Sequence, residues 1–227
     1  MRDKVLVVTG GFGVLGHAVA EAALAAGAYV ALPGREQESK IPVGDRLLLL
    51  GGVDLTDFSA AKQACDTIAA RFGRIDGLAN IAGGFRWQTV GDGDLAGWTD
   101  LFAMNLVTAV TATKAALPYL RATQGAIVNV GSAPAKKAGA GMGAYAASKA
   151  GVLRLTESLA EEEKNAGVRV NAVLPTIIDT PRNRAEMPKA DFSRWVKPED
   201  IAKAILFLLS NEATAITGAE LLISGRT

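Results

Sequence analysis

Short runs of apolar, often β-branched residues alternate along the chain with longer stretches in which apolar and small residues recur at helical spacing. The short runs cover residues 5–8, 29–32, 47–50, 75–80, 126–130, 168–174 and 221–224, and the long stretches cover 17–26, 56–72, 99–121, 143–165 and 198–209. Strands that alternate with long helices are typical of a parallel sheet covered by helices on both faces. We therefore predict an α/β fold with a doubly wound parallel sheet of about seven strands.

One segment interrupts this alternation. Pro175 ends a strand-like run, and residues 176–197 follow neither a strand nor a helix pattern before Pro198 begins the last helix. Long irregular segments are uncommon inside compact domains, and many of them have a function of their own. We interpret 176–197 as a lid over a site.

The composition favours one domain with a small-molecule partner. A chain of 227 residues, 49% of them hydrophobic, is long enough for one buried α/β core and short for two, so we treat 1–227 as a single domain. Lys and Arg together number 24 and Asp and Glu 23, without a basic block. This balance argues against a nucleic acid or an anionic membrane as the partner.

Cysteine and histidine occur once each, as Cys65 and His17. A lone cysteine excludes an intramolecular disulfide and fits a reducing compartment, and a lone histidine argues against a histidine-rich metal site, so we expect no metal. The first residues lack the apolar region and cleavage site of a signal peptide, and no run of about 18 consecutive apolar residues occurs. These features lead us to expect a cytoplasmic protein.

A glycine-rich turn follows the first strand-like run. Residues 9–16 read Thr-Gly-Gly-Phe-Gly-Val-Leu-Gly, and an alanine-rich helical stretch comes next. Glycines allow a tight turn and a close backbone approach, so the helix N-terminus can receive a pyrophosphate on its free N–H groups. Strand, glycine turn and helix in this order predict a dinucleotide-binding site of the Rossmann type.

The end of the second strand-like run bears on which dinucleotide binds. An acidic residue at this position hydrogen-bonds a ribose 2′-hydroxyl, whereas a nearby arginine accepts a 2′-phosphate. The acidic position falls at Gly34, and Arg35 follows at once. Its planar guanidinium can meet a phosphate bidentately, so we predict a preference for NADP over NAD, although Glu36 and Glu38 could oppose the phosphate.

Tyr145 and Lys149 lie four residues apart in a predicted helix and therefore share one of its faces. A lysine held beside a tyrosine favours the phenolate and pulls the pKa of the phenol toward neutrality. Ser132 follows a strand-like run upstream, and Asn105 lies in the helix before it. The pair alone also fits an amphipathic helix with a solvated lysine, but its polar company favours general acid/base chemistry.

The segment 85–98 carries three aromatic residues, Phe85, Trp87 and Trp98, among glycines and aspartates. Aromatic residues in a loop are commonly hydrophobic anchors. This loop leaves the carboxyl end of a strand, where doubly wound sheets bind their ligands. We therefore regard Phe85 and Trp87 as candidate pocket residues.

Several motifs, each weak alone, occur together in a specific order: the glycine turn, Asn80 with Ala82 and Gly83, Asn105, Ser132, Tyr145 and Lys149. In this order the sequence resembles the short-chain dehydrogenase/reductase superfamily over nearly its whole length. The resemblance implies that Tyr145 donates and accepts the proton and that Lys149 supports it and binds the cofactor ribose. It also implies that Ser132 polarises a substrate carbonyl and that Asn105 anchors a proton-relay water.

The resemblance further implies a nicotinamide cofactor and its contacts. Together with Arg35, the expected cofactor-binding residues are Thr9, Gly10, Phe12, Gly13, Val14, Leu15 and Gly16 in the turn, Asp54 and Leu55 at the adenine, Asn80, Ala82 and Gly83 after the fourth strand, Tyr145 and Lys149, and Pro175, Ile178 and Thr180 at the nicotinamide. The helices over 99–121 and 143–165 resemble the family's assembly helices, which implies a homotetramer or homodimer.

The activity expected from these residues is hydride transfer between a nicotinamide and a small carbonyl or alcohol, with Tyr145 as general acid/base. Two departures leave alternatives open. Val14 and Thr176 stand where the family usually has glycine, and glycines at 10, 13 and 16 resemble the extended or dihydropteridine-reductase branches. A pteridine or other C=N or C=C reductase is thus a second reading, which Ser132 weakens. A cofactor-sensing regulator without turnover is a third, although it has no chemical need for the four polar residues.

Overall fold

The computed structural model describes residues 1–36, 41, 42 and 44–226. Within this part of the chain, seven parallel strands form one sheet in the order β3-β2-β1-β4-β5-β6-β7. The strands are β1 (Val5–Thr9), β2 (Tyr29–Pro33), β3 (Leu47–Leu50), β4 (Gly77–Asn80), β5 (Ala126–Val130), β6 (Arg169–Pro175) and β7 (Glu220–Ile223). The predicted doubly wound parallel sheet is confirmed.

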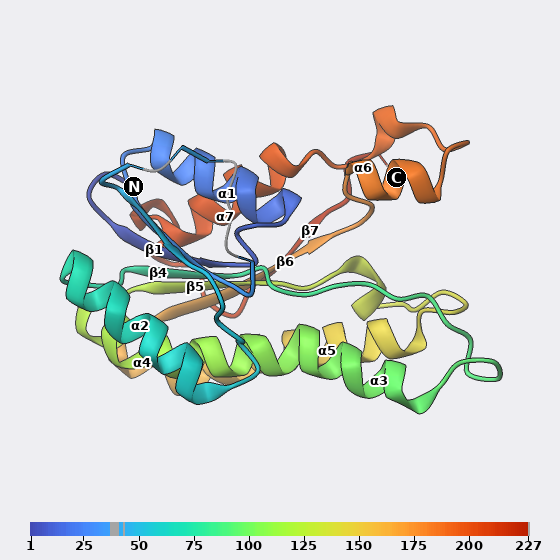
Figure 1. Cartoon of the computed structure of the whole chain (residues 1–227), viewed down its shortest axis with the longest axis horizontal. Coiled ribbons are helices and arrows are strands. Elements are labelled where there is room, and N and C mark those ends of the chain that lie inside the picture. Colours follow the sequence, from blue (N-terminus) through green and yellow to red (C-terminus); the bar gives the residue numbers. More distant parts are fainter. Residues whose placement is uncertain (37–40, 43, 227) are drawn as a thin grey trace.

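Helices cover both faces of the sheet, as Figure 1 shows. One layer holds α1 (Val14–Ala25) and α7 (Pro198–Leu209), and the other holds α2 (Phe58–Phe72), α4 (Thr108–Thr123) and α5 (Gly143–Glu162). The shorter helices are α3 (Leu95–Phe102), the π-helix η1 (Ala103–Val107), α6 (Pro181–Glu186), and the 3₁₀ turns η2 (Ala133–Ala135), η3 (Lys164–Ala166), η4 (Phe192–Arg194) and η5 (Asn211–Ala213).

The central strands are apolar along their whole length because both faces of the sheet are covered. In β1, Leu6 and Val8 pack in the core shared with α1 and α7, whereas Val5 and Val7 pack in the core shared with α2, α4 and α5. All four side chains are buried. Burial on both sides explains why the strand-like runs of the sequence show no polar alternation.

The predicted single helix over 99–121 is wrong at its start and in its interior. The helical stretch begins earlier, with α3, and passes through the five-residue π-helix Ala103–Val107 before α4 begins. Asp94 starts the stretch by accepting a hydrogen bond from the Gly97 N–H at 2.6 Å. A π-turn adds one residue to a helical turn without a change of composition, so a 3.6-residue pattern does not reveal it.

The 176–197 segment is also more regular than its sequence predicts, since it contains α6 and η4. Its two ends meet in a parallel bridge between Ile178 and Val196. The C-terminal residues hold it as well, because the Arg226 N–H donates to the Arg194 carbonyl at 3.1 Å and Arg194 Nε donates to the Arg226 carbonyl at 2.9 Å. The segment is a closed loop fastened at its base.

The continuous helical stretch Leu95–Thr123 is long and apolar enough to cross a membrane by length and composition alone. Half of its most apolar window is buried inside the protein. Ala112, Ala115 and Leu120 of this stretch belong to the core between α4 and the sheet. Packing against the sheet therefore accounts for part of its apolar character.

Candidate active site

The chain runs from β1 outward to β2 and β3 on one side of the sheet, and from β4 outward to β5, β6 and β7 on the other. The direction of the chain connections therefore reverses between β1 and β4. Open α/β sheets bind ligands beyond the carboxyl ends of the strands at such a switch point. Thr9 ends β1, Asn80 ends β4 and Val130 ends β5. Predicted site residues from distant parts of the sequence therefore meet at one edge of the sheet, from which the loop to α3 and the segment with α6 extend in Figure 1.

The glycine turn after β1 is too tight for side chains at two positions. Gly10 has φ +65°, and a Cβ there would lie 2.8 Å from the Ala82 backbone nitrogen. A Cβ at Gly16 would overlap the Gly10 carbonyl oxygen. Glycine at both positions lets α1 begin directly beneath the loop that follows β4.

The N-terminus of α1 is suited to an anion. Gly13 is the N-cap residue, no side chain caps the helix, and Val14 and Leu15 are the first residues of its first turn. The uncapped N–H groups and the helix dipole favour negative charge at this end. The predicted pyrophosphate position therefore lies in a backbone cradle that only small residues leave open.

Thr9 joins the ends of the two central strands. Its hydroxyl donates to the Ala79 carbonyl at 3.3 Å and accepts from the Ile81 and Ala82 N–H groups at 3.0 and 3.1 Å. These bonds place Ala82 and Gly83 beside the glycine turn. Thr9 thus shapes the site through the backbone that it holds.

Asn80 is buried, and its side chain turns into the protein. Its amide nitrogen donates to Thr113 Oγ1 at 3.0 Å and to Asn129 Oδ1 at 2.9 Å. Asn129 in turn donates to Thr156 on α5 at 2.9 Å. The amide links β4 to α4 and β5, and it supports the strand end from which Ala82 and Gly83 follow.

Asn105 lies in the π-helix and is 1% exposed. Its Oδ1 accepts from the Gly84 N–H at 2.9 Å, and its Nδ2 donates to the Gly84 carbonyl at 3.1 Å and to Ser148 Oγ at 3.0 Å. Ser148 also donates to the Tyr145 carbonyl at 2.7 Å. The Asn105 side chain therefore ties the loop after β4 to α5.

Sequence reasoning missed Ser148, the fully buried partner of Asn105. A signal was present, because a small polar residue three positions after Tyr145 shares the helix face that carries Tyr145 and Lys149. Its hydrogen-bond partner comes from a helix far away in the sequence. Only the fold reveals that pairing.

Lys149 is 5% exposed, and its ammonium group donates to the carbonyl of Val130 at 2.8 Å. Burial lowers the pKa of Lys149 to about 8. The Nζ atom also lies 3.4 Å from the point where Gly83 would carry a Cβ. Because Gly83 is glycine, the backbone after β4 can pass close to the lysine.

Tyr145 is partly exposed, whereas Ser132 is buried. Burial raises the pKa of the Tyr145 phenol, and a hydrogen bond with the Ser132 hydroxyl opposes that rise. The ring of Phe85 meets the Tyr145 ring edge to face, with the centroids 4.9 Å apart. The structure thus brings Ser132, Tyr145, Lys149 and Asn105 into one site, and it places Phe85 against that site.

Comparison with known proteins agrees with this geometry. A family model described as Enoyl-(Acyl carrier protein) reductase matches residues 13–225. 2-(S)-hydroxypropyl-CoM dehydrogenase 3 from Xanthobacter autotrophicus is 34% identical over 99% of this chain and 96% of its own, and D-threitol dehydrogenase from Mycolicibacterium smegmatis is 36% identical over 99% and 93%. A solved short-chain type dehydrogenase/reductase from Mycobacterium ulcerans has a TM-score of 0.90 at 26% identity, over 100% of this chain and 90% of that one.

This chain belongs to the short-chain dehydrogenase/reductase superfamily. It is an oxidoreductase that uses a nicotinamide cofactor to interconvert small alcohols and carbonyl compounds. The family, the fold class and the enzyme class predicted from the sequence are confirmed. Neither the reading as a pteridine or other C=N or C=C reductase nor that as a regulator without turnover is favoured.

The residues of this short-chain dehydrogenase/reductase fit a dinucleotide. The turn at Gly10 and Gly16 would be blocked by any side chain, and Gly83 is an exposed glycine whose Cβ would overlap Asn105 Oδ1. Because these positions carry no side chain, a pyrophosphate can approach the backbone closely. When bound there, the cofactor supplies or accepts the hydride.

At the adenosine end, the ring of Phe12 fills the space where Gly34 would carry a side chain, 2.9 Å from the ideal Cβ position. The Glu36 carboxylate lies near the same point, at 3.2 Å. Arg35 is exposed and close enough to contribute to the lowered pKa of Asp54, whose main cause is the hydrogen bond from the Thr56 N–H. Both a cation and an anion therefore follow the end of β2, while Glu38 lies outside the described residues.

The residues expected at the nicotinamide lie at the start of the 176–197 segment. Pro175 ends β6, and Ile178 forms the bridge with Val196 that closes the segment. Thr180 caps α6, because its Oγ1 accepts from the Asn183 N–H at 3.1 Å. In this structure Ile178 and Thr180 thus have defined structural roles at the base of the 176–197 segment.

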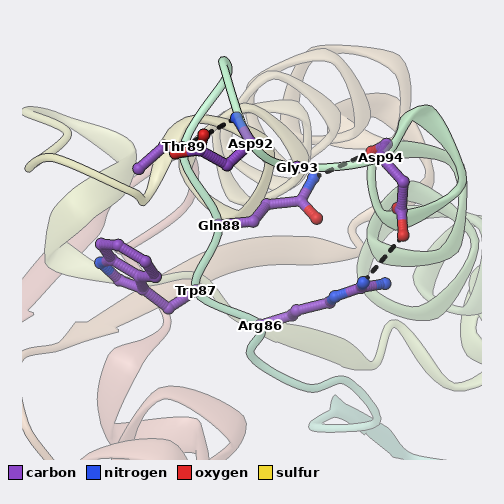
Figure 2. Close-up of a pocket in the computed structure, with 7 residues that line it drawn as sticks. All are labelled: Arg86, Trp87, Gln88, Thr89, Asp92, Gly93 and Asp94. Atoms are coloured by element: carbon purple, nitrogen blue, oxygen red, sulfur yellow. Dashed lines mark hydrogen bonds and ion pairs between the residues drawn. The ribbon is translucent and has the colours of Figure 1, made fainter.

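The loop 86–94 encloses a surface hollow of about 330 Å³, shown in Figure 2. Apart from Trp87 and Gly93, the lining residues are polar, and they include the ion pair between Arg86 and Asp94 at 2.9 Å. Trp87 extends to the other side of the loop from Arg86 and Gln88. Ser132, Tyr145 and Lys149 do not line this hollow, so it lies outside the chemistry described above.

Proposed function

We propose that Tyr145 is the general acid/base of the reaction, that Ser132 polarises the substrate oxygen, and that Lys149 and Asn105 support Tyr145. The observation that carries this proposal is that Ser132 lies close enough to the Tyr145 phenol to lower its pKa, while Lys149, one helical turn along α5 from Tyr145, holds a buried ammonium. Two hydroxyl groups that converge on one point can both contact a single carbonyl or alcohol oxygen.

In the direction of reduction, negative charge develops on the carbonyl oxygen as hydride reaches its carbon. Tyr145 transfers its proton to that oxygen, and Ser132 donates a hydrogen bond that strengthens as the charge grows. In the direction of oxidation, the Tyr145 phenolate accepts the proton of the alcohol. Both directions require the substrate carbon to be held close to the nicotinamide.

Lys149 makes the proton transfer feasible near neutral pH. Burial raises the pKa of Tyr145 and so disfavours its phenolate. A positive charge on the same helix face favours the phenolate. We assign to the Lys149 ammonium this electrostatic role and a hydrogen bond to the cofactor ribose. Its pKa of about 8 in the cofactor-free protein leaves it protonated at neutral pH.

We propose NADP as the preferred cofactor. Gly34 offers no carboxylate to a 2′-hydroxyl, and Arg35 follows it in an exposed position. The guanidinium can donate two parallel hydrogen bonds to a 2′-phosphate. Glu36, near the same position, opposes this preference.

We further propose a homotetramer or homodimer assembled through the helices of residues 99–121 and 143–165. Val107 and Val110 are each 39% exposed on this helical stretch, and Phe102 is 37% exposed. Covering such side chains stabilises an interface. We also propose that 176–197 closes over bound substrate and that the protein is cytoplasmic, since its one cysteine, Cys65, is a buried free thiol.

The experiment that tests the proposed activity is a turnover screen with cofactor binding measured on the same sample. The panel contains secondary alcohols, polyols, ketones and hydroxyaldehydes, each with NADPH or NADH or their oxidised forms, together with a dihydropterin and an enoyl thioester. We expect turnover of an alcohol or carbonyl compound. Cofactor binding without turnover of any compound, or turnover only of the pterin or enoyl compound, would contradict the proposal.

A further inference from the structure

Among the described residues, Phe85 is the one aromatic residue whose ring packs against the Tyr145 ring. The rings meet at an interplanar angle of 87° with their centroids 4.9 Å apart. This is the edge-to-face arrangement that aromatic pairs prefer. Tyr145 is therefore held from α5 on one side and by a ring from the β4–α3 loop on the other.

The loop that carries Phe85 is fastened on both sides. Before Phe85, Gly84 exchanges two hydrogen bonds with the Asn105 side chain. After it, the Trp87 indole N–H donates to the Ala140 carbonyl at 3.0 Å, and the Gln88 N–H donates to the Gly141 carbonyl at 2.9 Å. Residues 140 and 141 lie just ahead of α5, so the position of Phe85 is set relative to the helix that carries Tyr145.

The Trp87 ring also packs directly on Gly141. Gly141 has φ +72°, and a Cβ at this position would overlap the indole. The contact needs glycine for both reasons. Trp87 is 58% exposed, so its fixed position comes from this contact and the indole hydrogen bond.

We infer that Phe85 is a positioning residue for Tyr145, which fixes the direction of the phenol and excludes water from one face of its ring. The inference rests on the proposed role of Tyr145 for its catalytic meaning. The ring contact itself does not depend on that role. Phe85 acts through its contact with the Tyr145 ring.

Other polar groups also belong to the elements around Tyr145. Lys149 lies on α5 itself and carries an ammonium, and Ser132 follows the end of β5 and carries a neutral hydroxyl. Asn105 on the π-helix is neutral, and Arg86 beside Phe85 is paired with Asp94 on the other side of the loop from Trp87. Replacing Phe85 by a smaller residue leaves these charges unchanged and hydrates the Tyr145 ring.

Hydration of the phenol has a defined sign. Burial raises the pKa of Tyr145, so water admitted by Phe85→Ala should lower it. The limb of the pH–rate profile that reports Tyr145 should move to lower pH by the same amount. Phe85→Leu keeps apolar volume without a ring and should give a smaller shift.

The test is a pH titration of protein labelled with ¹³C at the tyrosine ζ-carbon, followed by NMR. The chain has three tyrosines, and Tyr145→Phe assigns the signal of Tyr145. Wild type, Phe85→Ala and Phe85→Leu are compared with Val90→Ala, which changes an 80% exposed residue of the same loop. Thermal unfolding identifies the variants that fold. If Phe85→Ala does not fold, the comparison of Phe85→Leu with wild type decides the test.

We expect Tyr145 to titrate at lower pH in the Phe85 variants, and the Val90→Ala signal to match wild type. An unchanged Tyr145 midpoint in folded Phe85 variants would overturn the inference, whatever their turnover. A second outcome combines a shifted Tyr145 midpoint in the Phe85 variants with unchanged turnover in Tyr145→Phe. It would contradict the proposed catalytic role of Tyr145 and leave the positioning contact intact. The two failures are thus distinguishable.

Discussion

Lys149 is the most strongly desolvated charge of the candidate site. It is almost fully buried, and its ammonium donates a hydrogen bond to the Val130 carbonyl. Burial without a counter-charge explains why its pKa falls to about 8. A lysine in this state gains much when ribose hydroxyls and a phenolate become its partners, so cofactor and substrate binding should both depend on it.

Lys149→Met should weaken cofactor binding and move the activity profile to higher pH, because the phenolate of Tyr145 loses its stabilising charge. In wild type, cofactor affinity should fall as pH rises through about 8, where Lys149 loses its proton. Calorimetric titration with NADPH between neutral and alkaline pH measures both effects. Lys203→Met, a change at an exposed lysine paired with Asp200, is the control. Equal dissociation constants and profiles in both variants would place Lys149 outside the site.

Arg35 should set the cofactor preference. A charge-assisted hydrogen bond contributes ~1.5 to 3 kcal/mol, which corresponds to roughly 10- to 150-fold in the ratio of kcat/KM for NADPH over NADH. Arg35→Ala should bring this ratio close to one. Glu36→Gln should increase the ratio, because the Glu36 carboxylate lies beside Gly34 and its negative charge opposes a 2′-phosphate there. A native preference for NADH, or a ratio that Arg35→Ala does not change, would exclude Arg35 from the phosphate site.

At the scale of elements, the π-helix Ala103–Val107 connects the loop after β4 to α5. It presents Asn105 so that one amide satisfies both backbone groups of Gly84 and the hydroxyl of Ser148. π-turns are rare and occur mostly at functional sites. Here the turn brings the loop after β4 and the helix that carries Tyr145 and Lys149 into one hydrogen-bonded unit.

Asn105→Ala should therefore cost stability as well as activity. It leaves the Gly84 N–H and carbonyl without the partner that they have in the wild type, and each unsatisfied buried group costs about 1 to 3 kcal/mol. The free energy of unfolding, measured by denaturant titration, and kcat should both decrease. Asn165→Ala, a change at an exposed asparagine, should alter neither. Native stability with native kcat in Asn105→Ala would show that the amide is dispensable.

The sequence predicted the elements well where burial on two sides makes a strand uniformly apolar, as in β1, and where glycines have no alternative, as at Gly10 and Gly16. It predicted Asn105, Ser132, Tyr145 and Lys149 as one group because the family resemblance orders them. It did not predict the π-turn, α6 or the pairing of Asn105 with Ser148. These features depend on contacts between distant segments, which local periodicity does not contain.

At the scale of the whole molecule, the fold leaves apolar side chains of the Leu95–Thr123 stretch at the surface. Phe102, Val107 and Val110 are each more than a third exposed while the opposite side of the stretch is in the core. A second copy of the chain that covers this face would remove that exposure. The interface proposed on these helices follows from the same side chains.

Light scattering at micromolar concentration should report a homotetramer or a homodimer. Val110→Lys, which places a charge in the proposed interface, should shift the mass toward the monomer. Leu95→Lys changes an 86% exposed residue at the start of the same stretch and is the matched control. A monomeric wild type, or an assembly unaffected by Val110→Lys, would contradict the proposed interface.

The central claim is that Tyr145 exchanges the proton with the substrate oxygen during hydride transfer. It is tested most directly by comparing kcat and cofactor Kd of wild type and Tyr145→Phe with the best substrate from the turnover screen. The substitution removes the transferable proton and keeps the ring that packs on Phe85. A general acid/base typically contributes ~10² to 10⁴ in rate, so kcat should fall by about that factor while the cofactor Kd stays near the wild-type value. A kcat close to wild type would contradict the account.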